Sequence, residues 1–152
     1  MRAILPLEDG SIWLGTAQGL NHYQAQQMQS YTTREGLTAD FVVALHKIGD
    51  VLWIGTGTGV TRLIKGKFEP LSLSELDQTE YAFDFFEQAE QKLLWLATDR
   101  GLVRYRLDTA ELSLVGRKAG IPFDKIFQVQ ADLHGNLWLS SNRGILRISQ
   151  QD

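Results

Sequence analysis

The chain has 152 residues, of which 43% are hydrophobic and 22% are charged, and its formal net charge is −3. This length suits one ordinary domain and this composition a globular protein, with no apolar run long enough to span a membrane and no pattern of a secretory signal. The lack of cysteine excludes disulfides, a cysteine nucleophile and thiolate metal ligands, and the lack of a Lys/Arg block argues against a nucleic-acid binder.

The first predicted elements are four short strands joined by turns. An apolar stretch at residues 3–5 is followed by a turn signal at residues 8–11 and by a β-type run at residues 13–16. A tight turn that contains a glycine leads to a third run at residues 19–23, and a more polar strand is expected near residues 28–32. This part of the chain therefore predicts a four-stranded antiparallel meander.

The same pattern returns three more times, marked by the tryptophans of the chain. Their spacings are 40, 42 and 43 residues, and such a period indicates stacked supersecondary units. Each copy reads tryptophan, aliphatic, small, Thr or Ser, two variable residues, Gly and aliphatic, and the copies begin at Trp13, Trp53, Trp95 and Trp138. In the later copies, apolar first strands are expected near residues 41–45, 82–86 and 126–129, and polar fourth strands near residues 67–71 and 111–115.

Four strands in a repeat of this length are typical of a blade of a β-propeller. We therefore expect an all-β fold in one propeller or propeller fragment, with blades at approximately residues 1–37, 38–76, 77–121 and 122–152. The fourth copy has only its first three strands, which predicts a partial or self-associating ring, with a monomeric closed four-bladed ring as a further alternative. A short helical turn is expected at residues 74–77.

The repeated positions predict structural roles. The tryptophans are expected in the core, the apolar first strands are expected to pack on both faces, and the small residue after each tryptophan would let the next blade approach closely. A further repeated position holds a cation or an imidazole, which we interpret as covering apolar surface and pairing with a neighbouring blade rather than as a cationic ligand site. These residues are His22, Arg62, Arg104 and Arg147. The carboxylates Asp84, Glu87 and Glu90 are interpreted as solvated or edge-capping groups.

Motifs of enzymes are not found in this chain. It has no Gly-x-Ser-x-Gly elbow, His-Glu-x-x-His motif, P-loop or EF-hand spacing. The three histidines, His22, His46 and His134, are far apart in the sequence and lack a ligand spacing. The sequence therefore predicts no catalytic residue, no metal ligand and no cofactor.

Variable loops at one end of the blades are the candidate ligand-binding site, because a scaffold fixes the repeat while its loops are free to vary. One set of loops is the turn between the second and third strands, and the other is the crossover into each first strand. We expect both sets on one face and predict that they bind a small molecule, a carbohydrate or a carboxylate. The candidate residues are Asp99, Arg100, Asn142, Arg143, Arg34, Asp40, Tyr81 and Asp124, with Gln18, Thr58 and Lys125 in the same loops.

The repeat resembles the two-component regulator propeller repeat. The first copy carries the likeness in Asp9-Gly10, in Trp13-Leu14-Gly15-Thr16 and in the exit Glu35-Gly36-Leu37, while Ala97 and Ser140 replace a glycine of the family pattern. The resemblance implies a non-catalytic sensor segment of a bacterial membrane receptor, such as a hybrid histidine kinase or a diguanylate cyclase. It also implies a periplasmic location and, in the kinases, a carbohydrate ligand.

Two other functions fit a propeller of this kind. A lyase-type propeller of the streptogramin-inactivating kind would need a histidine base and metal-binding acids on one face. A structural or dimerising scaffold would pair its open edge strand with another chain. As to partners, we expect a homo-oligomer or a fragment of a larger propeller.

Overall fold

A computed structural model describes residues 3–71, 81–115 and 125–149 of the chain. Within these ranges the protein has fifteen β-strands and one short 3₁₀ helix, and the helical turn expected at residues 74–77 lies outside them. Blade 1 consists of β1 (Ala3–Pro6), β2 (Ile12–Thr16), β3 (Gly19–Gln24) and β4 (Gln27–Tyr31), and blade 2 of β5 (Val42–Ile48), β6 (Val51–Thr56), β7 (Gly59–Ile64) and β8 (Lys67–Leu71). Blade 3 consists of β9 (Ala82–Gln88), η1 (Ala89–Gln91), β10 (Leu93–Thr98), β11 (Gly101–Arg106) and β12 (Leu112–Val115), and blade 4 of β13 (Ile126–Ala131), β14 (Leu137–Ser141) and β15 (Gly144–Ile148).

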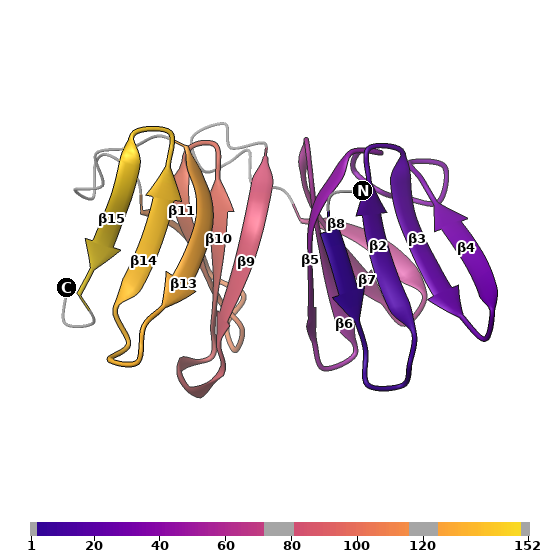
Figure 1. The fold of residues 1–152 in the computed structure, drawn as a ribbon, viewed down its shortest axis with the longest axis horizontal. Helices are drawn as coiled ribbons and strands as arrows, with labels where there is room; N and C mark the ends of the chain where they lie inside the picture. Colours follow the sequence, from indigo (N-terminus) through magenta and orange to yellow (C-terminus); the bar gives the residue numbers. More distant parts are fainter. Residues whose placement is uncertain (1–2, 72–80, 116–124, 150–152) are drawn as a thin grey trace. The chain divides into compact units, whose positions relative to one another are not determined.

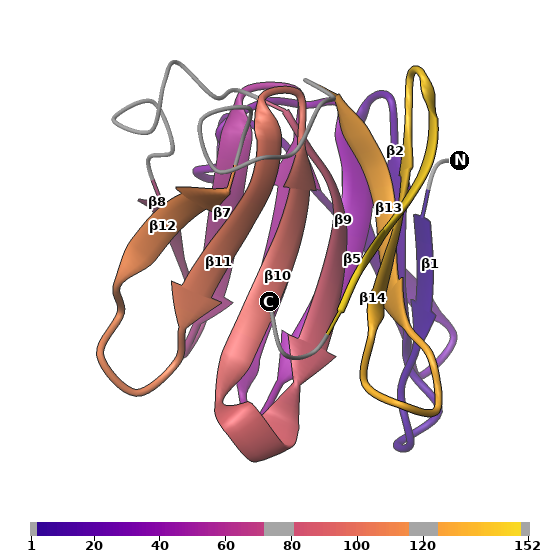
Figure 2. The ribbon, with the colours of Figure 1, turned by 90° about the vertical axis from the view of Figure 1, so that its left-hand side faces the viewer.

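Each blade is an antiparallel meander in which every strand pairs with the next one along the chain (Figures 1 and 2). In the described residues the four sheets have four, four, four and three strands. The tryptophan of each blade lies on the second strand, directly opposite the cation or imidazole of the third: Trp13 and His22, Trp53 and Arg62, Trp95 and Arg104, Trp138 and Arg147. The predicted all-β fold of four meanders is therefore confirmed, including the three strands of the last one.

The strands belong to two compact units. The first unit comprises residues 1–74 and 80–82, and the second comprises residues 75–79 and 83–152. Blades 1 and 2 lie in the first unit, and β10 to β15 lie in the second, which also takes β9 from Phe83 onward. Each unit therefore has a blade-to-blade interface of its own.

In the first unit, blades 1 and 2 share a hydrophobic core. Trp13 of blade 1 packs with Val42, Leu52 and Ile54 of blade 2, and all four side chains are 8% exposed or less. Gly15 faces the same neighbour, because a Cβ atom on Gly15 would lie 2.6 Å from Val42 Cγ1. The predicted close approach at the small residue is confirmed between these two blades.

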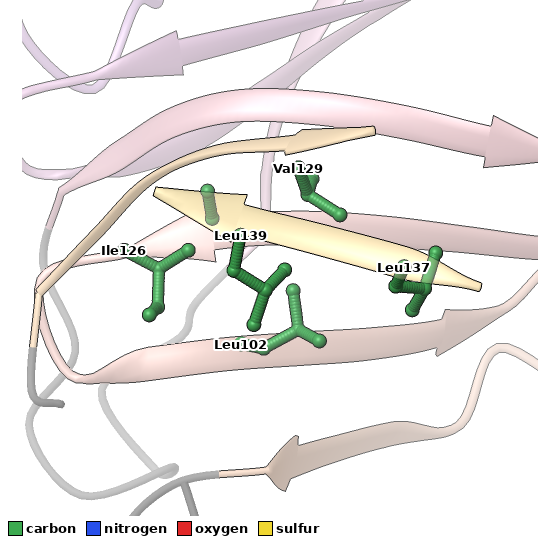
Figure 3. Close-up of a cluster of buried hydrophobic side chains, with 6 residues drawn as sticks. Leu102, Ile126, Val129, Leu137 and Leu139 are labelled. Carbon is green, nitrogen blue, oxygen red and sulfur yellow. The ribbon is translucent and has the colours of Figure 1, made fainter. Parts of the chain in front are cut away.

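In the second unit, the core lies between blades 3 and 4. Ile126, Val129, Leu137 and Leu139 of blade 4 form one cluster with Leu102 of blade 3 (Figure 3), and all five side chains are buried. Full burial of an aliphatic side chain of this size contributes about 1.5–3 kcal/mol to folding. This cluster therefore helps to hold blades 3 and 4 together.

The tryptophans differ in burial. Trp13 and Trp53 are buried and Trp95 is half-buried, but Trp138 is 43% exposed. The prediction that all four are core residues is thus wrong for Trp138. Its neighbours along β14 point into the core with blade 3, so the indole points to the other face of the sheet. No further blade of the second unit, as far as the structure describes it, lies on that face.

The first strands of the blades also differ in how much of each strand is buried. Strand β5 exposes only Lys47, whereas β1 exposes Ile4 and Pro6, and β13 exposes Phe127 and two glutamines. The expectation that a first strand packs on both faces is therefore wrong for β1 and β13. Blades 1 and 4 each have one face that no other described blade of their own unit covers.

Candidate functional site

The turn between the second and third strands is built in the same way in every blade. In blade 2, the Thr56 hydroxyl donates a hydrogen bond to the Gly59 carbonyl oxygen at 3.1 Å and accepts one from the Thr58 backbone N–H at 3.2 Å. The equivalent bonds of the other blades are made by Thr16, Thr98 and Ser141. The glycine that ends each turn has a φ between +127° and +134°, which favours glycine. The repeated Thr or Ser therefore closes the turn, a role that the sequence pattern had not revealed.

These turns carry the first group of candidate residues. Arg100, Asn142 and Arg143 are exposed, and Asp99 is half-buried. The backbone N–H groups of Arg100 and Arg143 donate to the hydroxyl that closes their turn, at 3.2 and 3.1 Å. Each guanidinium group is thus an exposed cation on an anchored backbone, ready to pair with an anionic oxygen.

The crossover segments reach the same turns within their own blade. In blade 2, the Gly57 N–H donates to the Phe41 carbonyl at 3.1 Å, and the Thr58 hydroxyl donates to the Thr38 carbonyl at 2.9 Å. In blade 4, the Asn142 N–H donates to the Lys125 carbonyl at 3.3 Å. Both sets of loops therefore lie at the same end of the sheet in blades 2 and 4.

The crossover candidates of the first unit have different environments. The Asp40 carboxylate accepts a hydrogen bond from the Thr33 backbone N–H at 2.9 Å, which fastens the crossover loop. Arg34 is exposed, and its backbone N–H donates to a threonine hydroxyl at 3.2 Å. Tyr81 lies beside the β6–β7 turn, since a Cβ atom on Gly57 would be 3.3 Å from Tyr81 Cε1. Asp40 thus has a structural bond, whereas Arg34 and Tyr81 present exposed side chains.

The candidate ligand-binding residues belong to the two different compact units. In the first unit, Tyr81 lies beside the β6–β7 turn. In the second unit, the turn with Asn142 and Arg143 meets Lys125, and blade 3 of the same unit carries the β10–β11 turn with Arg100. Asp124 lies outside the described residues.

Beside the β2–β3 turn, the first unit has an open hollow of about 450 Å³. Apart from Ala17, the side chains around it are polar: Thr16, Gln18, Asn21 and Ser30. The Ser30 hydroxyl donates a hydrogen bond to Asn21 Oδ1 at 2.6 Å, so this wall is held in place. Gln18 was expected at such a loop, whereas the two strand residues were not singled out.

A threonine cluster, missed in the sequence, fastens the crossover of blade 2 to its sheet. The Thr38 and Thr56 hydroxyl oxygens are 2.7 Å apart, and the Thr38 N–H donates to Thr61 Oγ1 at 2.9 Å. Thr56 and Thr61 are fully buried. The only sequence signal is a threonine directly after the exit Gly36-Leu37.

Asp84 joins blade 3 to blade 4 within the second unit. Its carboxylate accepts a hydrogen bond from the Val129 backbone N–H at 3.1 Å. Because β13 is an edge strand of its sheet, this N–H has no ladder partner on that side. Asp84 is half-buried, and its bond to an edge strand fits the second of the two expected roles, that of an edge-capping group.

Trp13 and Trp53 each pack against the residue opposite them in the same blade. The rings of Trp13 and His22 stack with their centroids 3.9 Å apart and 6° between their planes. The Arg62 guanidinium carbon lies 5.6 Å from the centroid of the Trp53 ring, a cation–π geometry. Burial lowers the pKa of His22 below its ordinary value. For His22 and Arg62, the packing partner is thus the indole of their own blade.

A second open hollow, of about 450 Å³, lies in the second unit between η1 and the β13–β14 turn. Asp132 at its edge accepts hydrogen bonds from Trp138 Nε1 at 2.9 Å, from the Asn136 side chain and backbone at 3.0 Å, and from the His134 N–H at 2.9 Å. The Trp138 bond, followed by that of the Asn136 side chain, holds the pKa of Asp132 well below its usual range. Asp132 thus organises this turn.

In residues 3–71, 81–115 and 125–149, no three His, Asp or Glu side chains gather closely enough to hold a metal ion. The same residues include no helix whose length and apolar character would let it cross a membrane.

Comparisons with solved structures give three informative matches. The extracellular domain of BT3049, assigned as a hybrid two-component system of B. thetaiotaomicron, matches with a TM-score of 0.84 and 26% identity over 95% of this chain and 21% of that chain. The extracellular domain of BT4673, assigned likewise in the same organism, matches with a TM-score of 0.80 and 24% identity over 95% and 20%. The WD40 β-propeller domain of Doa1 matches with a TM-score of 0.74 and 12% identity over 96% and 48%.

Family models and curated proteins add no further relative, because no model and no curated protein matches the chain. The chain spans about a fifth of the length of the two bacterial domains. Its four sheets correspond to blades of a partial propeller, and its structure matches that of extracellular domains of bacterial hybrid two-component systems.

Proposed function

We propose that this chain is a ligand-sensing segment of a β-propeller that lies in the periplasm as part of a bacterial two-component receptor. The match to the extracellular domain of BT3049, with a TM-score of 0.84 over 95% of the chain, carries this proposal. Residues 1–37, 38–76, 77–121 and 122–152 would be four successive blades of the sensor. Its role is to bind a small molecule, and the signal is passed on without any chemistry in this segment.

The binding surface in this proposal is the loop end of the blades. Arg100 and Arg143 offer exposed guanidinium groups, which bind carboxylate oxygens in a bidentate manner. The Asn142 side chain and the Tyr81 ring suit the hydroxyls and the apolar faces of a sugar. These groups support a small carbohydrate or carboxylate as the ligand.

The test is a search for a ligand with the full chain. Thermal unfolding in the presence of a panel of carbohydrates and small carboxylates identifies compounds that raise the Tm, and calorimetry then measures their Kd. We expect Arg100→Ala and Arg143→Ala each to raise the Kd of a compound so identified at least tenfold. A hydrogen bond to a charged group contributes about 1.5–3 kcal/mol, which corresponds to this change.

Arg106→Ala is the matched control for the two arginine variants. Arg106 is also exposed and lies at the other end of β11, away from the β10–β11 turn. The control should bind like the unchanged protein. Three variants with equal affinity would rule out the loop end as the binding surface, and a panel that contains no stabilising compound would argue against sensing of this ligand class.

A further inference from the structure

Blade 4 has a sheet face that no described residue of another blade in the second unit covers. In the β14–β15 ladder, Trp138 pairs with Arg147 and Ser140 pairs with Ile145. Paired residues and alternate residues of a strand share a face, so these four side chains form one surface, which we call the Trp138 face. Trp138 and Ile145 are 43% and 72% exposed.

The corresponding face of blade 1 is covered by the next blade. Trp13 is buried there against the aliphatic face of blade 2, which includes Leu52 and Ile54. The second unit repeats this arrangement, because Ala97 of blade 3 packs against Leu139 of blade 4. In both units, the face of a blade that carries its tryptophan binds the opposite, aliphatic face of the blade that follows.

Blade 1 carries an exposed aliphatic face of the same kind. Counted from the tryptophan of each blade, its Ile12 and Leu14 occupy the positions of Leu52 and Ile54 in blade 2. Ile4 pairs with Leu14 and is 57% exposed. The strand register places the exposed side chains of Tyr23 and Met28 on the same surface. We call this surface the Ile4 face, and its residues are Ile4, Ile12, Leu14, Tyr23 and Met28.

We propose that the Trp138 face of one copy of this chain binds the Ile4 face of a second copy. The partner follows from the repeat, because the chain carries both halves of a contact that it already makes between blades 1 and 2 and between blades 3 and 4. Trp138 is suited to anchor the contact, since its Nε1 is fixed to Asp132 Oδ2 at 2.9 Å while its ring stays exposed.

The two faces differ, so the association is head-to-tail rather than symmetric about one patch. A head-to-tail contact stops growing when each copy uses both of its faces in a closed ring, and a ring of two copies is the assembly that we propose. The proposal concerns the assembly of this chain and is independent of any ligand at the loop end.

The test is the mass of the full chain in solution, measured by light scattering and sedimentation over a wide range of concentration. We expect the unchanged protein to form a dimer. Ile145→Arg and Ile4→Arg should each give a monomer with an unchanged circular dichroism spectrum, because both side chains are largely exposed in the single chain. Leu133→Arg is the matched control: Leu133 is fully exposed in the β13–β14 turn, outside both faces, and its variant should remain a dimer.

Mixing the two monomeric variants separates the head-to-tail contact from a symmetric one. Ile4→Arg retains the Trp138 face and Ile145→Arg retains the Ile4 face, so an equimolar mixture should form a one-to-one complex. A monomeric unchanged protein at high concentration would overturn the proposal, as would a dimer that survives both substitutions. A mixture that stays monomeric would overturn the head-to-tail pairing.

Discussion

Val42 of β5 lies so close to Gly15 of β2 that a Cβ atom on Gly15 would be 2.6 Å from Val42 Cγ1. The next nearest atoms are Val42 Cβ and the Val42 carbonyl oxygen, both at 3.3 Å. The neighbour is therefore a β-branched side chain together with its backbone, within a close-packed core, and neither can move away at low cost. The missing side chain of Gly15 sets the distance between blades 1 and 2.

We expect Gly15→Ala to lower the free energy of unfolding by about 1–3 kcal/mol, because overpacking forces side chains or backbone to shift. Urea unfolding followed by circular dichroism measures the loss. Gly57→Ala is the matched control in the same unit, since the atoms nearest to its added Cβ belong to the exposed ring of Tyr81, at 3.3 Å or more. Equal losses in both variants would show that the contact with Val42 is not the cause.

The turn hydroxyls give a second prediction. Thr98→Val keeps the shape of a fully buried side chain but removes its bonds to the Gly101 carbonyl, at 2.7 Å, and to the Arg100 N–H, at 3.2 Å. We expect a loss of about 1–3 kcal/mol in guanidinium unfolding, because the buried groups lose their partners. Ser141→Ala removes the two equivalent bonds of blade 4, which lie in an exposed turn where water replaces them. This substitution should therefore lower the free energy of unfolding by less. Identical costs would contradict this account.

The strand order could be predicted because a repeat presents the same local signals several times. The tryptophan, the turn glycine and the apolar first strand each recur, and short turns leave antiparallel pairing of successive strands as the natural result. The position of the candidate loops followed from the same signals, since the turn after each second strand is fixed by the repeat. Where Asn142 meets Lys125, the two loop sets do come together.

The burial of each repeated residue could not be predicted, because it depends on which blade covers it. The local sequence pattern does not contain this information. Trp13 and Trp138 hold the same place in the repeat, yet only Trp13 has a further blade of its unit against its face. The bond of Asp84 to Val129 joins residues 45 positions apart. The side chains that a ligand would contact vary between copies for the same reason.

The β3–β4 turn gives a prediction in the direction of higher stability. Ala25 and Gln26 have φ values of +52° and +64°, a conformation that costs a residue other than glycine about 1–2 kcal/mol. We expect Gln26→Gly to raise the free energy of unfolding by about 0.5–1 kcal/mol, after the greater entropy of glycine in the unfolded chain is subtracted.

Blade 2 provides the matched control for this turn. Its corresponding residues are Lys65 and Gly66, with φ values of +50° and +80°. The reverse change, Gly66→Gln, should lower the free energy of unfolding by a similar amount, and urea unfolding measures both variants. If neither change alters stability, backbone strain in these turns is negligible.

The stack of His22 on Trp13 predicts a pH dependence. Burial lowers the pKa of His22 in the folded protein below its ordinary value of 6.5, Asp9 opposes this shift and Lys47 adds to it. The unfolded chain therefore binds the proton more readily. The part of the stability that depends on His22 is thus complete above pH 6.5 and is lost as the pH falls through the folded pKa.

Urea unfolding at a series of pH values measures this slope, and NMR titration of the imidazole gives the pKa directly. His22→Gln should remove the part of the slope that belongs to His22. His134→Gln, a change in an exposed turn outside the stack, should leave that part in place. An NMR pKa at or above 6.5 for His22 would contradict the effect of burial.

Asp132 predicts a second pH dependence of stability, at acidic pH. The hydrogen bond from the Trp138 indole, supported by those of Asn136 and the His134 N–H, holds the pKa of Asp132 well below its ordinary 3.8. The stability that these bonds provide is therefore complete above this ordinary value and is lost as the pH falls through the folded pKa. Asp132→Asn should lower stability at neutral pH and remove this acid-dependent part.

Trp138→Phe distinguishes the indole from the other donors around Asp132. It removes the largest cause of the low pKa and keeps the backbone and Asn136 bonds, so the folded pKa should rise toward its ordinary value. The acid-dependent loss of stability should therefore be smaller than in the unchanged protein and should be complete at a higher pH. Measurement at low protein concentration keeps any self-association through the Trp138 face out of the result. If the acid transition stayed where it is in the unchanged protein, the indole would have no part in holding the charge of Asp132, and the exposed ring would be fixed by packing alone.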